Sequence, residues 1–267
     1  MTLLVGPVDS LSRHKKKCEG LTLEAEVFDK TGVFIIRKMF IESYITSYRN
    51  YLTNNLNIGI ATRNKFNPVS IETSDPFARS IVHEPKLVEE LKKILGLDIC
   101  LYNFRIVMKD EINDAAVFLH NDIGYHLGQT TRVSVFVAVS DAGAGNGGME
   151  FFLGTHNFGL LGDAGELNIE VLGENWPTIT PSLVAGDVVI MHSALWHRSG
   201  PNLEKRLRIL ADIHYQPASD PTGIELISGK WMTDYRIPRE VVPRLFKRSR
   251  VSRLLELEEK LARAKEE

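Results

Sequence analysis

The chain has 267 residues, of which 43% are hydrophobic and 25% charged, which is typical of a globular protein with a substantial core. Its formal net charge of −2 argues against the positive field that nucleic-acid binding usually needs. No stretch approaches the roughly 20 apolar residues of a membrane span, and the N-terminus has its apolar run before its basic cluster, the reverse of a signal peptide. Two cysteines are too few for a disulfide framework. We expect a cytoplasmic protein, monomeric or homodimeric, without nucleic-acid or membrane partners.

The first 96 residues are expected to be largely helical, with one short buried strand at residues 32–36. A helix is predicted next, because apolar residues recur at the spacing of one helix face. These residues are Ile41, Tyr44, Ile45, Tyr48 and Leu52. A second helix is predicted to begin at Pro85 and to end at Gly96.

From Leu97 the apolar period changes to two, which indicates strands. Tyr102, Phe104, Ile106 and Met108 are expected on one face of the first strand, and further strands are expected at residues 133–140, 188–191 and 206–215. Short strands between turn residues indicate a β-sandwich or barrel. We expect a single domain that is mainly β with flanking helices. It would have a core at about 97–217, a helical N-terminal part at 1–96 and a helical C-terminal tail at about 240–267.

Three further segments are open to more than one interpretation. The charged C-terminal helix carries Leu254, Leu257 and Leu261, and would either pack on the domain or bind a partner. A basic patch at residues 244–253 is either a solvated surface or a site for an anionic partner. The acidic loop at 160–181 is either a lid or a surface insertion.

A metal site is suggested by His120 and Asp122, because alternate residues of an extended strand point to the same side. His197, which follows an apolar strand, would complete the set of two imidazoles and one carboxylate found in non-haem Fe(II) oxygenases. His192 is the rival for this third position. Arg208 lies on the polar face of its strand, and an inward arginine needs an anionic partner. The distal carboxylate of 2-oxoglutarate would supply that partner.

The pattern of His120-x-Asp122, then His197-x-Ser199-Gly-Pro-Asn202, then Arg208 resembles the phytanoyl-CoA hydroxylase family of Fe(II)- and 2-oxoglutarate-dependent dioxygenases. The resemblance runs from about Gly32 to Tyr215 and implies a double-stranded β-helix, a form of jelly roll. It implies that His120, Asp122 and His197 ligate iron. It also implies that Arg208, Ser199 and Asn103 bind 2-oxoglutarate.

The resemblance implies hydroxylation of an unactivated C–H bond by O2, with release of succinate and CO2. Halogenases of this superfamily lack the acidic ligand, so Asp122 favours hydroxylation or desaturation. A polar small molecule, such as a biosynthetic intermediate, is the expected substrate, because a set of polar residues indicates a polar pocket: Asn103, Arg105, Lys109, Asn121, Tyr125 and His126. Those expected to contact substrate are Arg105, Asn121, Tyr125 and His126. A metal-dependent cupin isomerase or epimerase, a binding module without catalysis and a nucleic-acid demethylase are the competing hypotheses.

Overall fold

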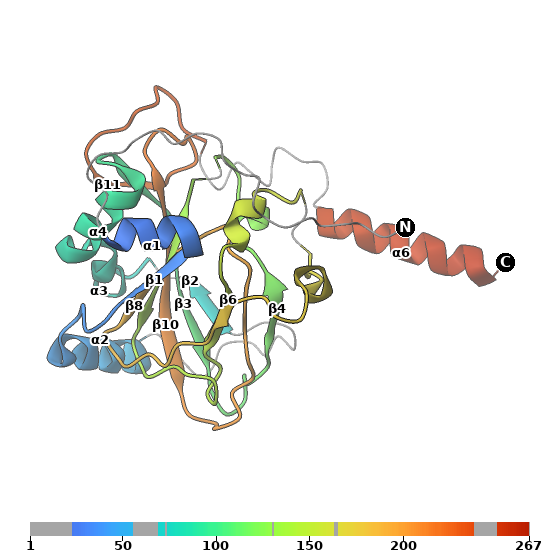
Figure 1. Ribbon diagram of the computed structural model, residues 1–267, viewed down its shortest axis with the longest axis horizontal. Coiled ribbons are helices and arrows are strands. Elements are labelled where there is room, and N and C mark those ends of the chain that lie inside the picture. The colour runs from blue at the N-terminus through green and yellow to red at the C-terminus, as the bar shows by residue number, and fades with distance from the viewer. Residues whose placement is uncertain are drawn as a thin grey trace.

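The computed structural model of the chain describes residues 23–55, 69–72, 74–129, 131–162, 165–237 and 250–266. Two antiparallel sheets face each other, and helices cover the outer face of the larger sheet (Figure 1). This is the mainly β jelly-roll fold predicted from the alternating strands. No helix in the described ranges has both the length and the apolar character that would be needed to cross a bilayer.

The larger sheet has the order β1-β8-β5-β10-β3-β11, and β2 pairs with β3 on the same edge as β11. The smaller sheet has the order β4-β9-β6-β7. The strands of the larger sheet are β1 (Val33–Ile36), β2 (Val69–Glu72), β3 (Ile99–Lys109), β5 (Val133–Ala138), β8 (Val188–His192), β10 (Arg208–Pro217) and β11 (Glu225–Ser228). Those of the smaller sheet are β4 (Val117–His120), β6 (Met149–Phe152), β7 (Thr178–Ile179) and β9 (His197–Ser199).

The helices of the N-terminal part bury their apolar faces on the larger sheet. They are α1 (Leu23–Thr31), α2 (Glu42–Asn55), α3 (Pro76–Arg79) and α4 (Pro85–Leu95), and short 3-10 turns are η1 (Ser80–His83), η2 (Ile123–Tyr125), η3 (Thr155–Phe158) and η4 (Ile169–Leu172). Pro85 opens α4 and Gly96, with φ of 86°, follows its last residue, as predicted. Ile41 differs from the prediction, because it precedes α2 and is 66% exposed.

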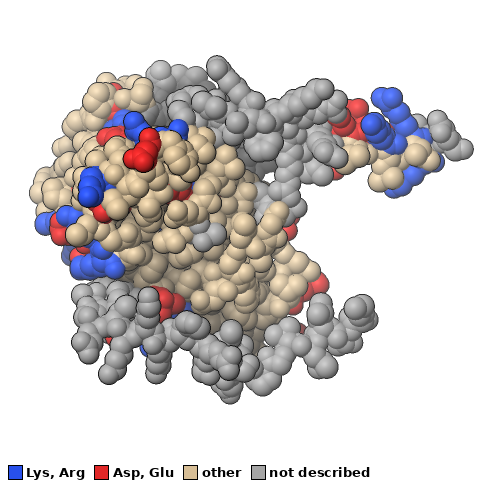
Figure 2. Space-filling view, turned by 90° about the horizontal axis from the view of Figure 1, so that it is seen from above, with Lys and Arg blue, Asp and Glu red and all other residues tan. Residues whose placement is uncertain are grey.

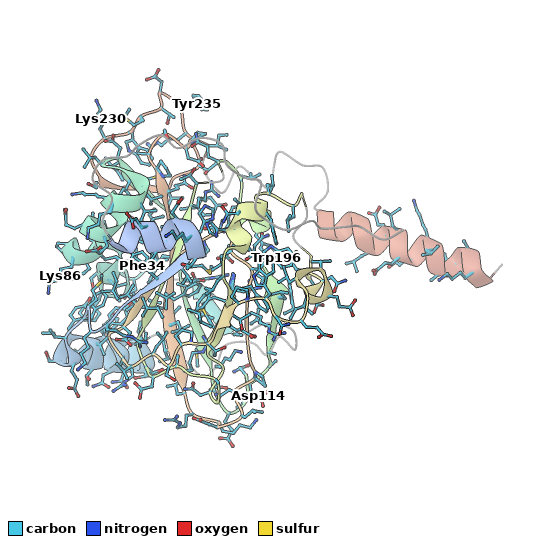
Figure 3. All side chains as sticks on the ribbon, in the orientation of Figure 1. Phe34, Lys86, Asp114, Trp196, Lys230 and Tyr235 are labelled. Atoms are coloured by element: carbon cyan, nitrogen blue, oxygen red, sulfur yellow. The ribbon has the colours of Figure 1, made fainter. Side chains whose placement is uncertain are left out.

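Alternation along β10 separates two environments. Ile209, Ala211 and Ile213 belong to the core under the helices, whereas Leu210 packs in the core between the two sheets. Phe34 of the first core and Trp196, which packs with the smaller sheet, are labelled in Figure 3.

Strand β3 departs from the predicted alternation at Tyr102. Leu101 pairs with Tyr215 and Asn103 pairs with His214, so Tyr102 is an extra residue at a bulge. Its ring packs against His126 instead of joining the core under the helices. A bulge reverses which residues of a strand face inward. The prediction that Tyr102 shares a face with Phe104 is therefore wrong.

Helix α6 (Arg250–Glu266) extends away from the body of the molecule (Figure 1). Its described leucines are more than half exposed, so they do not pack on the domain. Residues 1–22, 238–249 and the side chains at 250–254 lie outside the described part, and with them the predicted basic patch. On the face shown in Figure 2, acidic and basic residues are interspersed.

Candidate metal centre

Three side chains that could bind a metal converge between the sheets, at the edge where β4 pairs with β9. His120 ends β4 and is the register partner of His197, which begins β9. The sequence argument placed Asp122 on an extended strand, but the strand ends at His120 and Asp122 has helical angles before η2. The backbone N–H groups of Asp122 and Ile123 both donate to the carbonyl of Ser193, at 2.8 and 3.0 Å. This turn, rather than a strand, directs the carboxylate toward the imidazoles.

The ligand atoms lie within 4.8 Å of one another. Asp122 Oδ1 is 3.7 Å from His120 Nε2 and 3.8 Å from His197 Nε2, distances that one ion with metal–nitrogen bonds of about 2.1 Å can bridge. His120 Nδ1 lies 2.8 Å from the carbonyl of Phe118, and His197 Nδ1 lies 3.0 Å from that of Leu195. A carbonyl can only accept, so we assign the proton of each ring to Nδ1, which leaves both Nε2 lone pairs for a metal.

The electrostatics of the three residues suit a cation. Burial, with the nearby His197, lowers the pKa of His120 to about 4, so its imidazole is neutral near pH 7. Burial alone would raise the pKa of Asp122, but the surrounding imidazoles of His197, His214 and His120 hold it below its usual value. One carboxylate and two imidazoles form the facial arrangement of non-haem iron oxygenases.

A cavity opens beside the three residues, and paired positions of β3 and β10 form one of its walls. Three cross-strand pairs follow one another along the two strands: Lys109 with Arg208, Val107 with Leu210, and Arg105 with Asp212. We call them the cationic, apolar and ion-pair rows. Alternate residues lie about 6.6 Å apart along a strand, so the outer rows are separated by about 13 Å.

The cationic row buries two positive charges together. Arg208 is 2% exposed, its Nε has no hydrogen-bond partner, and burial lowers its pKa to about 10. Burial and the charge of Arg208 lower the pKa of Lys109 to about 7. Lys109 Nζ donates to Ser199 Oγ at 2.8 Å and to the carbonyl of Gly200. Gly147, with φ of 82°, makes room, since a Cβ there would lie 2.6 Å from the Lys109 stem.

No carboxylate among the described residues comes within 4 Å of either charged group in this row, although the nearby Asp114 favours the charged form of Lys109. An unpaired buried charge is costly, so an anion that reached Arg208 from the cavity would be stabilised there. The sequence predicted Arg208 and Ser199 at this place, whereas it counted Lys109 only among the polar residues of the substrate pocket. Lys109 belongs to this row because it is the register partner of Arg208.

The ion-pair row lies at the other end of the cavity wall. Arg105 Nε lies 2.5 Å from Asp212 Oδ2, and the Arg105 side chain is 36% exposed while that of Asp212 is fully buried. His214 Nε2 lies 2.9 Å from the second oxygen of Asp212. The predicted Arg105 therefore lines the cavity, together with Asp212, which the sequence analysis did not select.

The remaining predicted residues are distributed around this centre. Tyr125 is half exposed, with its ring centroid 6.1 Å from that of His120, and the partly buried His126 packs against Tyr102 and His214. Asn103 pairs with His214 beyond the ion-pair row and does not line the cavity. Asn121 Oδ1 accepts from the N–H of Gly124, so it closes the turn after β4.

The rival ligand His192 lies in another cluster. Its Nδ1 accepts from the N–H of Ala194, and its ring packs 5.3 Å from that of His156 and 6.2 Å from that of Phe28. Burial lowers its pKa to about 4. Of the two histidines, only His197 joins His120 and Asp122.

The acidic loop at 160–181 packs on the smaller sheet along its described residues. The N–H of Leu167 donates to the carbonyl of Leu119 at 2.8 Å, and Trp176 Nε1 donates to that of Leu153 at 3.0 Å. Leu172 is buried against Phe152. The loop thus covers β4 and β6, the two strands that flank β9.

The sequence model of the phytanoyl-CoA dioxygenase family (PhyH) matches residues 54–210. No curated protein is matched by the sequence.

Solved structures share the fold at low sequence identity. The non-heme alpha-ketoglutarate-dependent epimerase SnoN from nogalamycin biosynthesis is 19% identical, with 74% of this chain and 84% of that chain covered and a TM-score of 0.64. The carbocyclase SnoK from the same biosynthesis is 18% identical, with coverages of 77% and 88% and a TM-score of 0.65. EctD from S. alaskensis with 2-oxoglutarate and 5-hydroxyectoine is 18% identical, with coverages of 80% and 84% and a TM-score of 0.66.

Proposed function

The chain belongs to the phytanoyl-CoA dioxygenase family, and we propose that it uses Fe(II), O2 and 2-oxoglutarate to hydroxylate an unactivated C–H bond of a polar small molecule. Succinate and CO2 are the other products. His120, Asp122 and His197 hold the iron. When bound, the iron supplies the oxidising chemistry that amino-acid side chains cannot provide.

The buried cationic row is the observation that carries this proposal. 2-Oxoglutarate has a distal carboxylate, then two methylene groups, then the keto acid that binds the metal. Arg208, which lines the cavity, fits the carboxylate, and Lys109 is paired with it in the wall behind. The apolar row of Val107 and Leu210 fits the methylene groups. Ser199, which accepts a hydrogen bond from Lys109, fixes that ammonium in place. A cupin isomerase would have no need for a buried anion site of this kind.

The ion-pair row supports the choice of a polar substrate. Arg105 is partly exposed in the cavity and is held by Asp212, so it offers a fixed cationic group beside the iron ligands. Tyr125 and His126, which follow the turn at Asp122, are further residues that we expect to contact the substrate. A substrate that fills the cavity would displace water from the metal, which protects the oxidant, and would hold one C–H bond in a fixed orientation.

Desaturation and epimerisation are the alternative outcomes on the same site. The epimerase SnoN and the carbocyclase SnoK have the same fold and are alpha-ketoglutarate-dependent by name, so the fold accommodates more than one outcome. The mass of the product separates them: hydroxylation adds one oxygen atom, desaturation removes a pair of hydrogens, and epimerisation leaves the mass unchanged.

The test is anaerobic loading with Fe(II) and 2-oxoglutarate, followed by O2 and quantification of succinate with a panel of polar substrates. We expect succinate from the wild type and none from His197→Ala or Asp122→Ala. His192→Gln is the matched control, because this histidine lies in a different cluster, and it should retain turnover. Turnover that survives both ligand substitutions would refute the metal assignment.

A further inference from the structure

We propose that Ser134 is a positioning residue that makes Asp122 a one-oxygen ligand of the metal. The inference rests on the proposed function, because it takes Asp122 as an iron ligand. Ser134 lies on β5 and is completely buried. Its Oγ is 2.6 Å from Asp122 Oδ2, the carboxylate oxygen that faces away from the imidazoles.

The Ser134 hydroxyl donates its hydrogen bond to Asp122. An ionised carboxylate can only accept, and its oxygen is the closest polar atom to Ser134. The other neighbours are farther away: Ser193 Oγ at 3.2 Å and His214 Nδ1 at 3.5 Å. The single hydroxyl proton therefore goes to Asp122 Oδ2. A hydrogen bond from a neutral hydroxyl to a buried anion is among the stronger kinds.

Strand pairing fixes the hydroxyl in this position. Ser134 is the register partner of His214 on β10 and of Met191 on β8, so it lies in the middle of three paired strands. His214 in turn contacts Asp212, which holds Arg105. This places Ser134 at the end of a continuous polar chain from the cavity wall to the metal ligand.

The number of coordination positions on the metal explains why this hydrogen bond matters. An octahedral ion with three protein ligand atoms keeps three positions, which a bidentate keto acid and O2 fill completely. A second oxygen from Asp122 would compete for one of them. Ser134 occupies that second oxygen, while Asp122 Oδ1 lies 3.7 and 3.8 Å from the two imidazole nitrogens.

The experiment compares Ser134→Ala with Ser140→Ala by anaerobic metal titration of the full chain, using Fe(II) and, independently of turnover, Mn(II). Ser140 is the matched control: its buried hydroxyl accepts from the N–H of Ile209 at 2.8 Å and bonds the carbonyl of Leu207, away from the ligands. We expect Ser134→Ala to weaken metal binding about 10- to 100-fold, and Ser140→Ala to leave it unchanged while lowering thermal stability. Ser134→Thr keeps the hydroxyl and should restore most of the affinity.

The possible results distinguish a failure of the Ser134 inference from a failure of the proposed function. Wild-type affinity in folded Ser134→Ala, or an equal loss in Ser140→Ala, overturns the positioning role. If His197→Ala removes metal binding while Ser134→Ala does not, the iron site stands and only this inference fails. If His197→Ala also binds metal like the wild type, the proposed function fails with it.

Discussion

Replacing Lys109 with methionine should stabilise the empty protein and weaken its binding of 2-oxoglutarate. Lys109 is fully buried beside Arg208, and its pKa falls from 10.5 to about 7. A pKa depression of this size means that burial destabilises the charged form of Lys109 by roughly 5 kcal/mol. Methionine has a similar length and no charge, so it removes this cost and keeps the packing.

The net gain is smaller than the electrostatic cost. Methionine cannot bond Ser199 Oγ or the carbonyl of Gly200, and each lost hydrogen bond costs about 1 kcal/mol. About 3 kcal/mol is left, which for a chain of this size raises the melting temperature by roughly 6–12 °C. Loss of a charged donor to 2-oxoglutarate costs about 1.5–3 kcal/mol, or roughly 10- to 150-fold in its dissociation constant.

The pH dependence of the stability gained by Lys109→Met provides a second test. Because the folded-state pKa of Lys109 is depressed, the burial cost is complete below pH of about 7, shrinks as the pH rises toward 10.5, and is absent above it. The stabilisation by methionine should therefore fall as the pH rises through this window. Arg208, which opposes the charge, and Asp114, which favours it, are the charged groups that set this pKa.

Thermal unfolding of the apoprotein and anaerobic titration with 2-oxoglutarate measure both effects. Lys86→Met on the exposed face of α4 is the control, and should change stability by no more than about 0.5 kcal/mol. A lower melting temperature at pH 6.5 together with unchanged 2-oxoglutarate affinity would show that Lys109 is a packing residue and not part of an anion site.

Two further substitutions test the other buried charges. Arg208→Ala should raise the 2-oxoglutarate requirement far more than the iron requirement, because Arg208 lies in the cationic row and not among the ligands; equal effects in the two titrations would contradict this. Asp220→Ala leaves Arg132 buried without its ion pair of 2.9 Å, and should cost about 3–5 kcal/mol in urea unfolding, whereas a cost below 1 kcal/mol would show that Arg132 is neutralised otherwise.

Local patterns predicted most of the fold. Periods of two located β3, β5 and β10, a short apolar run located β8, and Pro85 with Gly96 bounded α4 correctly. Helix α1 was missed. The bulge at Tyr102 was also missed, because its position is set by the pairing with β10 and leaves no mark in the local alternation.

The candidate site was predicted in part, and the reason is physical. His120, Asp122 and His197 converge as expected, although a turn and not a strand directs Asp122. Ser134 was missed because a serine on alternating strand positions is normally interpreted as solvent-facing. Lys109 was assigned to the polar substrate pocket and not to the position opposite Arg208. Only the register between strands far apart in sequence shows that these positions face a buried centre.

The two faces of β10 can be substituted independently of each other. Ile209 and Ala211 hold the core under the helices, while Leu210 between them lines the cavity with Val107 on the adjacent strand. Libraries confined to the apolar row would thus change how the cavity holds the chain of the keto acid, with little disturbance of the helical layer. A change of cosubstrate could proceed along the same division, in which the cavity face varies while the opposite face keeps the core under the helices intact.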